Sequence, residues 1–477
     1  MNHSSSILQF PGKKVKNPLL GVGDMIRRTL QDIETMVDGF GLEETYKSLH
    51  ITGVTTDSRQ VGKDSLFIPL VGDVYNGHEF GEKAVKDGAA AVIWQKSEKN
   101  PPKGVPVIFV EDTLKALQAL AKSYIHQLQV KVVGITGSNG KTTTKDMVAS
   151  LLETTYKVHK TKGNFNNHIG LPLTVLSMSE DTEVAVLEMG MSGKGEIELL
   201  SHIANPDVAV ITNIGESHLL DLGSREGIAE AKLEITKGLK KDGLFIYHGD
   251  EPLLQERVPA LSLNTATFGE KSTNDYFPTK INQELTGTSF KVENEEYFIP
   301  VLGKHNVWNA LAAYAVATHL GVKKEAIKEG FSSIKLTGMR LELIEAKNGA
   351  SIINDAYNAS PTSMKAAINL IENLKGFEKR FVVLGDMLEL GEEEKEYHRE
   401  VGRAIKSPNI SHIFTYGRLG AEIALGAREN YAQDFVHHFE DKSELIASLK
   451  SLIQKNDVVL VKASRGMKLE EVVNAFI

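Results

Sequence analysis

The residues of this chain that are best suited to do chemistry lie in a short glycine-rich turn. Residues 132–147, VVGITGSNGKTTTKDM, place an apolar run before the turn and a helix-like segment after it. In this order, strand, glycine turn and helix, a Gly-Lys-Thr motif indicates phosphate binding. Glycines let backbone N–H groups face an anion, Lys141 supplies a cation, and Thr142 offers a hydroxyl to the magnesium that accompanies a nucleotide. The turn therefore predicts a site for a nucleoside triphosphate, built from Gly137, Ser138, Asn139, Gly140, Lys141, Thr142 and Thr143.

One position of the turn departs from the strict phosphate-loop pattern. That pattern begins with glycine, whereas this chain has Ile135 there, so the flexibility of the loop must come from Gly137 and Gly140. The alternative is a chance Gly-Lys-Thr in a surface loop. The strand and helix that flank the turn disfavour it.

Three more polar residues follow expected strands of the same segment. Glu188 ends the apolar run VAVLE, and ligands of open parallel sheets bind at the carboxyl ends of strands, so it is placed to hold magnesium. His218 lies just beyond the next run, VAVIT, and is a candidate second metal ligand. A solvated carboxylate and a structural histidine are the alternatives. Lys232 stands among small and apolar residues, where a buried cation is costly, so it must be neutralised or paired with Glu230 or Glu234.

Four other tracts carry clustered polar residues. GNFNNHIGLP (163–172) is rich in asparagine, which either binds a polar ligand or stabilises turns. LGKHNVWNALAA (302–313) begins a helix, where Asn306 is a ligand contact, an N-cap, or both. INDAYNASP (353–361) follows a strand and precedes a helix opened by Ser363, while VKASRGMKLE (461–470) ends the last strand. The candidates in and near these tracts are Asn164, Asn166, Asn167, His305, Asn306, Asn309, Arg340, Asp355, Ser464 and Arg465.

The bulk composition is that of a globular protein with several domains. A length of 477 residues predicts about three domains. The net charge of −8 argues against a surface that coats nucleic acid. The absence of cysteine excludes disulfides and thiolate catalysis and fits a reducing compartment, and no apolar run reaches the roughly 18 residues of a membrane span. We therefore expect a cytoplasmic monomer, with residues 1–24 as a disordered extension that has no signal-peptide core.

Apolar runs alternate with helix-like segments through the rest of the chain. The expected strands are 66–70, 90–94, 105–110, 131–136, 184–188, 208–212, 243–247, 351–354, 381–384, 412–416 and 458–462, and the clearest helices are 113–127 and 307–320. Continuous apolar strands suit parallel sheets that are covered on both faces. We predict a three-domain α/β fold with domains at 25–129, 130–336 and 337–477. The central P-loop-type parallel-sheet domain is flanked by an N-terminal substrate domain and a C-terminal Rossmann-like α/β domain.

Taken together, these tracts resemble the Mur ligases, the ATP-dependent amide-forming enzymes of peptidoglycan precursor synthesis. The resemblance spans about residues 25–477 and rests on TTDSR (55–59), TGSNGKTTT (136–144), GNFNNHIGLP, LEMG (187–190), TNIGESHL (212–219), AKLEI (231–235), GKHNVWNALAA, NDAYNASP and LGDMLELG (384–391). The LEMG and NDAYNASP forms look most like the family member that adds D-alanyl-D-alanine.

The resemblance implies a reaction and its cofactors. The γ-phosphate of ATP passes to the terminal carboxylate of a UDP-N-acetylmuramoyl-tripeptide, and the amine of D-alanyl-D-alanine then displaces phosphate from the acyl phosphate. Two Mg²⁺ ions assist, and the residue that matches Lys232 is carbamylated by CO₂ in this family. A carbamate would turn the buried cation into an anion that helps to bind metal. No nucleic acid partner and no membrane span are expected.

The resemblance also implies a role for each candidate residue. Thr142 and Glu188 would hold one Mg²⁺, and His218 with carbamylated Lys232 the second. Lys141 and Arg340 would neutralise the transferred phosphoryl group, so the catalytic set is Lys141, Glu188, His218, Lys232 and Arg340. His305, Asn306 and Asn309 would meet the adenine, and Asp355 the ribose. The UDP-sugar peptide would be met by Asp57, Ser58, Arg59, His78, Asn166 and Asn167, and the dipeptide by Tyr357, Asn358, Ser464 and Arg465.

Three other functions compete with this one. Another ligase of the superfamily would add a diamino acid to a dipeptide precursor, or glutamate to folate. A nucleotide-dependent switch would hydrolyse ATP slowly and form no amide. A nucleotide kinase would transfer phosphate to a stable product without needing an amine.

Overall fold

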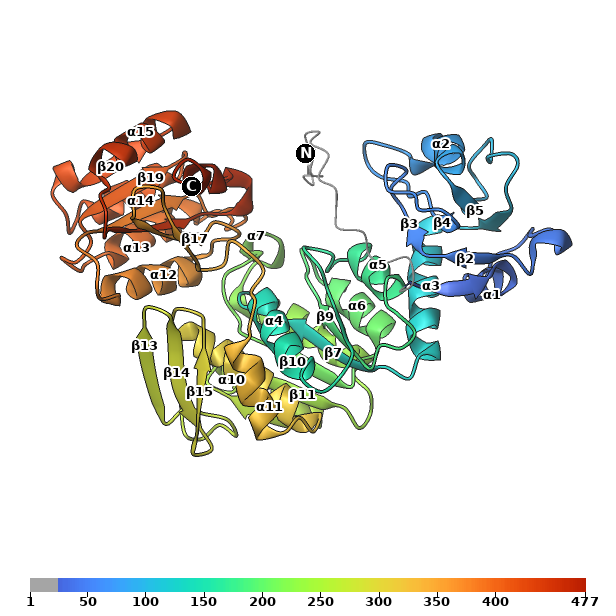
Figure 1. Cartoon of the computed structure of the whole chain (residues 1–477), viewed down its shortest axis with the longest axis horizontal. Coiled ribbons are helices and arrows are strands. Elements are labelled where there is room, and N and C mark those ends of the chain that lie inside the picture. The colour runs from blue at the N-terminus through green and yellow to red at the C-terminus, as the bar shows by residue number, and fades with distance from the viewer. Residues whose placement is uncertain (1–24) are drawn as a thin grey trace.

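The computed structural model describes residues 25–477, so the prediction made for residues 1–24 lies outside the described part of the chain. Three α/β units follow one another along the chain, from the blue N-terminal unit through the central one to the orange and red C-terminal one (Figure 1). Each contains a largely parallel sheet. The predicted three-domain α/β fold is confirmed.

The N-terminal unit combines a parallel sheet of order β3-β4-β5-β6 with an antiparallel pair, β1-β2. Its elements are β1 (Arg27–Thr29), α1 (Leu30–Met36), β2 (His50–Thr52), β3 (Val54–Thr55), β4 (Ser65–Phe67), α2 (Gly81–Lys86), β5 (Ala89–Gln95), β6 (Val107–Val110) and α3 (Thr113–Gln127). Helix α3 has the bounds that the sequence predicted, because Asp112 caps its start by accepting from the Lys115 N–H.

The central unit is built on a parallel sheet of order β12-β11-β10-β7-β9-β8. Its elements are β7 (Lys131–Thr136), α4 (Lys141–Leu152), β8 (Val158–Lys160), α5 (Gly170–Leu176), β9 (Val184–Glu188), α6 (Glu196–Ala204), β10 (Val208–Ile211), α7 (Leu219–Leu222), α8 (Arg225–Leu233), β11 (Leu244–His248), α9 (Pro252–Arg257) and β12 (Asn264–Phe268). Strands β7 and β9 were predicted with these bounds. The edge strand β8 was not predicted, because its three residues are only half-buried and carry no apolar run.

A second layer covers one face of this sheet. It consists of the antiparallel strands β13 (Lys280–Glu284), β14 (Gly287–Val292) and β15 (Glu295–Ile299), with helices α10 (His305–His319) and α11 (Lys324–Ser332). Helix α10 is buried along almost its whole length and packs against α4. Helix α4 packs on β7, β8 and β9, and α10 packs on β11 and β12, so the two helices lie side by side on this face of the sheet.

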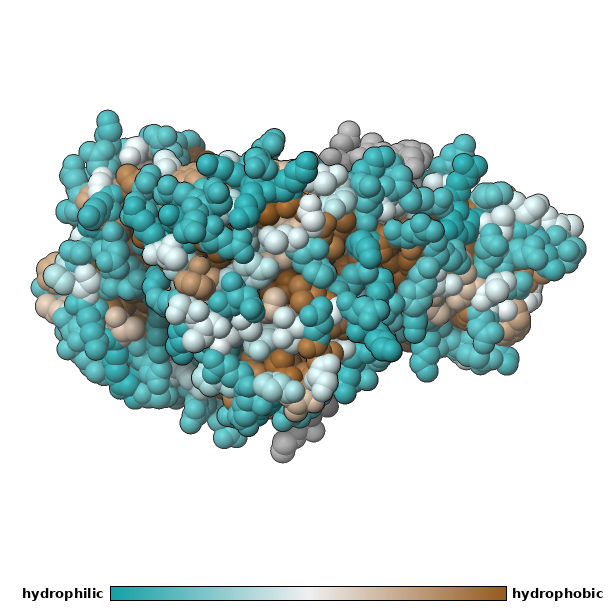
Figure 2. Space-filling view, turned by 90° about the horizontal axis from the view of Figure 1, so that it is seen from below, coloured by the Kyte–Doolittle hydropathy of each residue, from teal (hydrophilic) through white to brown (hydrophobic). Residues whose placement is uncertain are grey.

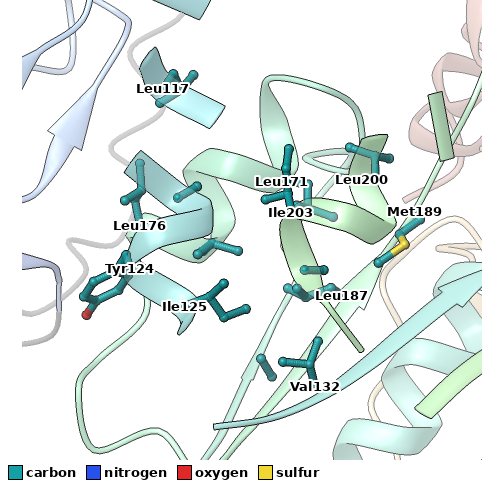
Figure 3. Close-up of a cluster of buried hydrophobic side chains, with 14 of the residues drawn as sticks. Leu117, Tyr124, Ile125, Val132, Leu171, Leu176, Leu187, Met189, Leu200 and Ile203 are labelled. Atoms are coloured by element: carbon teal, nitrogen blue, oxygen red, sulfur yellow. The ribbon is translucent and has the colours of Figure 1, made fainter. Parts of the chain in front are cut away.

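The other face of the central sheet is covered partly by a helix of the N-terminal unit. Leu117, Tyr124 and Ile125 of α3 lie against Leu171 and Leu176 of α5 in one apolar cluster (Figure 3). The cluster continues to the central sheet. The connection at 127–130 thus joins two units that share a core.

The C-terminal unit is a six-stranded sheet of order β16-β17-β21-β18-β19-β20, parallel except for β16. Its elements are β16 (Glu342–Glu345), β17 (Ser351–Asp355), α12 (Pro361–Asn373), β18 (Arg380–Gly385), α13 (Glu394–Ala404), β19 (His412–Tyr416), α14 (Gly420–Ala427), β20 (Val436–Phe439), α15 (Lys442–Leu452), β21 (Val458–Lys462) and α16 (Glu470–Asn474). The prediction that Ser363 opens α12 is wrong. Ser360 is the N-cap and accepts from the Ser363 N–H, and Pro361 occupies the first turn.

Hydrophilic residues cover most of the face shown in Figure 2, and the hydrophobic residues visible there lie mainly in its recesses. Within residues 25–477, no helix combines the length and apolarity that a bilayer span requires.

Candidate active site

A cavity of about 280 Å³ lies where the central and C-terminal units meet. Neighbouring strands β10, β7 and β9 deliver the loops that follow them to this place, as the parallel order of the sheet requires. The lining residues are Ser138, Asn139, Gly140, Lys141, Thr142, Thr143, Asn166, Glu188, Asn213, His305, Asn306, Asn309, Arg340, Leu341, Asp355, Tyr357, Asn358, Thr362, Ser363, Ala366 and Lys462. Residues far apart in the sequence thus form a single site.

The phosphate loop presents free backbone donors to the cavity. Among the described residues, the amides of 140–143 have no acceptor, and α4 has no side-chain cap. Gly140 precedes α4 with φ +79°, and a Cβ there would lie 2.5 Å from Asn309 Oδ1, so glycine is required. Unpartnered N–H groups at a helix N-terminus, with its positive potential, bind phosphate.

Lys141 projects into the same cavity. Its Nζ donates to the Gly137 carbonyl at 2.8 Å, which keeps the ammonium over the loop. Burial lowers the pKa of Lys141, the Glu188 carboxylate opposes that change, and the Arg340 charge adds to it. A bound polyanion would favour the charged form of this lysine.

Glu188 and Thr142 form the acidic wall of the site. The Thr142 hydroxyl donates to Glu188 Oε2 at 2.8 Å, and the Asn166 amide donates to Glu188 Oε1 at 2.9 Å. The Glu188 N–H donates to Thr161 Oγ1, which fixes the end of β9. Glu188 is buried rather than solvated. A hydroxyl beside a buried carboxylate is an oxygen donor set suited to Mg²⁺.

Arg340 reaches this wall from the linker that precedes the C-terminal unit. Its guanidinium donates to Thr142 Oγ1 at 2.8 Å and lies 4.3 Å from the ring centroid of Tyr357. The Arg340 Nε and the Asn139 Nδ2 are buried donors without a hydrogen-bond partner among residues 25–477. Both residues line the cavity, so these donors are available to a ligand that accepts hydrogen bonds.

His305, Asn306 and Asn309 come together at the start of α10. The Asn309 Nδ2 donates to Asn306 Oδ1 at 2.8 Å, and Asn306 donates to the Leu302 carbonyl. The suggestion that Asn306 is the N-cap is wrong, because Lys304 holds that position and Asn306 lies inside the helix. Burial lowers the pKa of His305 to about 4, so the imidazole is neutral near pH 7. Neutral rings and amides suit contacts with a nucleobase.

Asp355 is the last residue of β17 and forms an ion pair with Lys462, a residue that was not predicted from the sequence. Lys462, at the end of neighbouring β21, donates to Asp355 Oδ2 at 2.6 Å and to the Asn358 carbonyl at 3.0 Å. Both Asp355 and Lys462 line the cavity. The Asn358 side chain bonds the Ala359 N–H.

Lys232 is buried on α8 and outside the lining of the cavity. The proposed pairing with Glu230 or Glu234 is wrong: Glu230 pairs with Lys194, and Glu234 accepts from the Gly195 and Glu198 amides. In the part of the chain that the structure describes, the Lys232 Nζ has no ion-pair or hydrogen-bond partner. Burial lowers its pKa well below the usual value, and the positive charge of Lys141 adds to this effect.

His218 lies in the loop after β10, and this loop packs on the phosphate loop through Ser217 and the Ser138 carbonyl. The His218 ring does not line the cavity. Its Nδ1 is 2.9 Å from Glu389 Oε2 of the C-terminal unit, close enough for an ion pair but outside hydrogen-bonding geometry. Within residues 25–477, no group of three or more His, Asp or Glu side chains is arranged to hold a metal.

The other predicted substrate contacts lie at three places. In the N-terminal unit, Arg59 forms a two-point pair with Asp57 at 2.8–2.9 Å, and the carbonyl of buried Ser58 accepts from Lys83. His78 is buried, with Nδ1 next to Asn76 Oδ1 and Nε2 accepting from the Gln95 N–H, so both ring nitrogens are already engaged.

Asn167 caps the start of α5 through the Gly170 N–H. Ser464 accepts from the Leu388 N–H, and Arg465 pairs with Glu470. Neither Ser464 nor Arg465 lines the cavity.

Sequence reasoning missed several residues of the cavity. Asn213 fixes the phosphate loop, because its carbonyl and Oδ1 accept from the Ser138 and Asn139 amides. Lys462 is the last residue of an apolar strand, as Glu188 is, and that position was the available signal. Thr362 and Ser363 gave no such signal in the sequence, because their position at the cavity depends on how helix α12 packs in the tertiary structure.

Three family models match the chain in order: "Mur ligase family, catalytic domain" at residues 50–125, "Mur ligase middle domain" at 135–317 and "Mur ligase, glutamate ligase domain" at 339–465. A curated UDP-N-acetylmuramoyl-tripeptide–D-alanyl-D-alanine ligase of Bacillus subtilis is 56% identical over 455 residues, 95% of this chain and 99% of that protein. The chain belongs to the Mur ligase family.

Solved structures of Mur ligases agree with this fold. MurF from Acinetobacter baumannii matches with a TM-score of 0.86 and 31% identity, over 94% of this chain and 99% of that one. MurF from Thermotoga maritima in complex with ADP matches with a TM-score of 0.79 and 31% identity, over 89% and 96%. The predicted likeness to the D-alanyl-D-alanine-adding member of the family is confirmed.

Proposed function

We propose that this Mur ligase joins D-alanyl-D-alanine to UDP-N-acetylmuramoyl-tripeptide at the expense of ATP, in peptidoglycan precursor synthesis. One observation carries the proposal: a single cavity holds free helix N-terminal amides, the cationic side chains of Lys141, Arg340 and Lys462, and the buried carboxylate of Glu188. The B. subtilis relative with this name supports the choice of substrates. The ADP complex of the T. maritima relative supports ATP as the nucleotide.

The residues of the cavity fit a two-step reaction. A carboxylate oxygen of the tripeptide attacks the γ-phosphorus, the bond to the bridging oxygen breaks, and ADP leaves. The amine nitrogen then attacks the acyl carbon, loses a proton, and phosphate departs as the amide forms. A carboxylate resists amines because oxide is a poor leaving group, and phosphorylation removes that obstacle. Lys141 and Arg340 stabilise the charge on the transferred group.

The first magnesium site is proposed at Thr142 and Glu188. Their oxygens are 2.8 Å apart at the wall of the cavity, and Mg²⁺ commonly binds one or two protein oxygens together with substrate phosphates. Thr142 and Glu188 would hold such an ion, and its positive charge would offset the negative charge of the phosphates there. Asn166 holds the carboxylate from its other side.

We propose further that Lys232 is carbamylated and contributes to a second Mg²⁺ site with His218. The support is its environment, because burial without an anionic partner among the described residues lowers the pKa of this amine and so favours the neutral form, which is the form that reacts with CO₂. As an unmodified amine it has no oxygen to offer a metal. His218 faces Glu389 in this structure, so its part in the site rests on the family resemblance.

The remaining assignments are also proposals. His305, Asn306 and Asn309 contact the adenine, and Asp355, held by Lys462, the ribose. Asp57, Ser58, Arg59 and His78 bind the UDP-sugar peptide with Asn166 and Asn167. Tyr357, Asn358, Ser464 and Arg465 bind the dipeptide.

Mass spectrometry of the reaction product tests the function. Purified protein is given ATP, Mg²⁺, D-alanyl-D-alanine and UDP-muramoyl-tripeptide ending in either lysine or diaminopimelate. We expect the mass of the UDP-muramoyl-pentapeptide, together with ADP and phosphate. Turnover supported only by a single diamino acid, or by glutamate with folate, would identify another ligase.

A control reaction without the dipeptide addresses the remaining alternatives. Omitting the dipeptide should nearly stop ADP formation by a ligase. A kinase would still produce a stable phosphorylated product, and a nucleotide switch would hydrolyse ATP without forming an amide in any mixture.

A further inference from the structure

The linker between the central and C-terminal units is fastened to the helix that carries the phosphate loop. The Thr337 N–H and hydroxyl both donate to Asp146 Oδ2 at 2.8 Å. Three residues later, Arg340 donates to the Thr142 hydroxyl. Thr142 and Asp146 are four positions apart on α4 and therefore lie on one face of it. The linker thus runs beside α4 with two points of attachment, and in Figure 1 it passes next to this helix.

Asp146 is a fixed and charged acceptor. Its side chain is buried, and its Oδ1 lies 3.1 Å from Lys160 Nζ and 3.3 Å from Lys145 Nζ. Burial alone would raise the pKa of Asp146, but the two lysines and the Thr337 bonds outweigh it and lower the pKa. Lys145 is itself anchored by donating to the Thr161 carbonyl. The fastening point therefore belongs to the rigid part of the central unit.

Beyond Thr337 the backbone bends sharply on both sides of Arg340. Met339 has φ +62° and Leu341 has φ +51°, left-handed values that cost a residue with a side chain about 1–2 kcal/mol each. The Leu341 N–H donates to Asp355 Oδ1, and Tyr357 lies over the guanidinium. Such a bend persists only where the surroundings hold it. Thr337 holds it on the central side, and Asp355 on the C-terminal side.

We propose that Asp146 and Thr337 are positioning residues that set Arg340 over the terminal phosphate of ATP. The proposal rests on the proposed function, because it assigns Arg340 to the transferred phosphoryl group. Without the Thr337 anchor, the bend would relax and Arg340 would sample positions away from Thr142. Binding of the α- and β-phosphates by the loop amides would persist, since the linker does not touch those amides.

The test compares triphosphate with diphosphate binding. Calorimetry measures the affinity for a non-hydrolysable ATP analogue and for ADP, with Mg²⁺, in wild type, Thr337→Val, Thr337→Ser and Arg340→Ala. Thr337→Val removes the hydroxyl bond to Asp146, and Thr337→Ser keeps it. Ser333→Ala is the matched control, because it removes a hydroxyl bond in the same connection that reaches only the Gly330 carbonyl. Thermal melts confirm that each variant is folded.

We expect Thr337→Val to lower the preference for the analogue over ADP by about three- to fivefold, the scale of one hydrogen bond. The affinity for ADP, the serine variant and the control should stay near wild type. In an Arg340→Ala background, Thr337→Val should change the preference no further, because it acts through Arg340.

An unchanged preference in Thr337→Val, or an equal loss with and without Arg340, overturns the positioning role. Failure of the wild type to form the pentapeptide refutes the proposed function instead, and the binding comparison does not depend on that product. A rise in the KM for ATP in Thr337→Val, with the KM for the UDP-sugar peptide unchanged, would agree with the binding result.

Discussion

Replacing Glu188 by glutamine removes the negative charge from the proposed magnesium site while nearly preserving side-chain volume. The wild-type carboxylate accepts from Thr142 and Asn166 and lies close enough to Lys141 to influence its pKa. Glutamine keeps one carbonyl acceptor, but its NH₂ faces either the Thr142 hydroxyl or the Asn166 amide. The main loss is therefore electrostatic.

The size of the effect follows from the charge removed. Two unit charges about 4 Å apart interact by about 4 kcal/mol at an effective dielectric constant near 20. Partial compensation by water and by the phosphates leaves about 2–4 kcal/mol, and each 1.36 kcal/mol is a factor of ten in rate. We expect Glu188→Gln to lower kcat/KM for ATP by about 30- to 1,000-fold at fixed Mg²⁺.

The assay follows phosphate release in the complete ligase mixture across a Mg²⁺ titration. The apparent Mg²⁺ requirement should rise, while the KM for the UDP-sugar peptide should change little. Glu183→Gln is the matched control, since this exposed residue precedes the same strand and, among the described residues, its side chain accepts a hydrogen bond only from the Lys157 N–H. It should behave as wild type.

A Glu188→Gln enzyme within about threefold of wild type at every Mg²⁺ concentration would refute the metal role. An equal change in the apparent Mg²⁺ requirement and in the KM for the UDP-sugar peptide would refute it as well. Either result would make Glu188 a structural acceptor for Thr142 and Asn166.

Three further outcomes are expected. Lys232→Ala should abolish ligation, bicarbonate should not restore it, and short carboxylic acids should restore part of it by replacing the carbamate; full activity of the variant would remove Lys232 from the mechanism. The folded pKa of His305 is below the unfolded value, so its contribution to stability is complete above about pH 6.5. This contribution is lost as the pH falls towards 4, so the melting temperature of the wild type should fall with it. His305→Gln should reduce this dependence of the melting temperature on pH. The connections at 127–130 and 336–338 should permit domain closure, so X-ray scattering should change on adding an ATP analogue with UDP-tripeptide. Identical curves would contradict closure.

The closure prediction applies differently to its two connections. Val130 and α3 belong to a buried apolar cluster shared with α5 (Figure 3). Bending there would expose that cluster to water. The linker around Thr337 is half-buried and held by its hydrogen bonds to Asp146, so movement beyond that anchor exposes less apolar surface than bending at 127–130.

The phosphate site could be predicted from the sequence because its parts are consecutive. Strand β7, the loop and α4 follow one another without a break, and their local sequence pattern predicts both the strand–turn–helix structure and phosphate binding. Glu188 was predictable for a related reason, since the carboxyl ends of adjacent parallel strands meet at one edge. The alternative that Asn306 is an N-cap was wrong, because a start of α10 at His305 depends on packing and not on a local polar signal.

The amino-acid sequence by itself determined the alternation of strands and helices, the phosphate loop and the carboxylate that ends β9. These depend on periodicity and on neighbours along the chain. The tertiary structure decided which distant groups meet: Lys462 with Asp355, Arg340 with Thr142, and Thr337 with Asp146. It also decided that Lys232 stays without a carboxylate partner. Such pairings depend on how the C-terminal unit and the buried helices dock, and hydrogen bonds across 100 or more residues leave no local pattern.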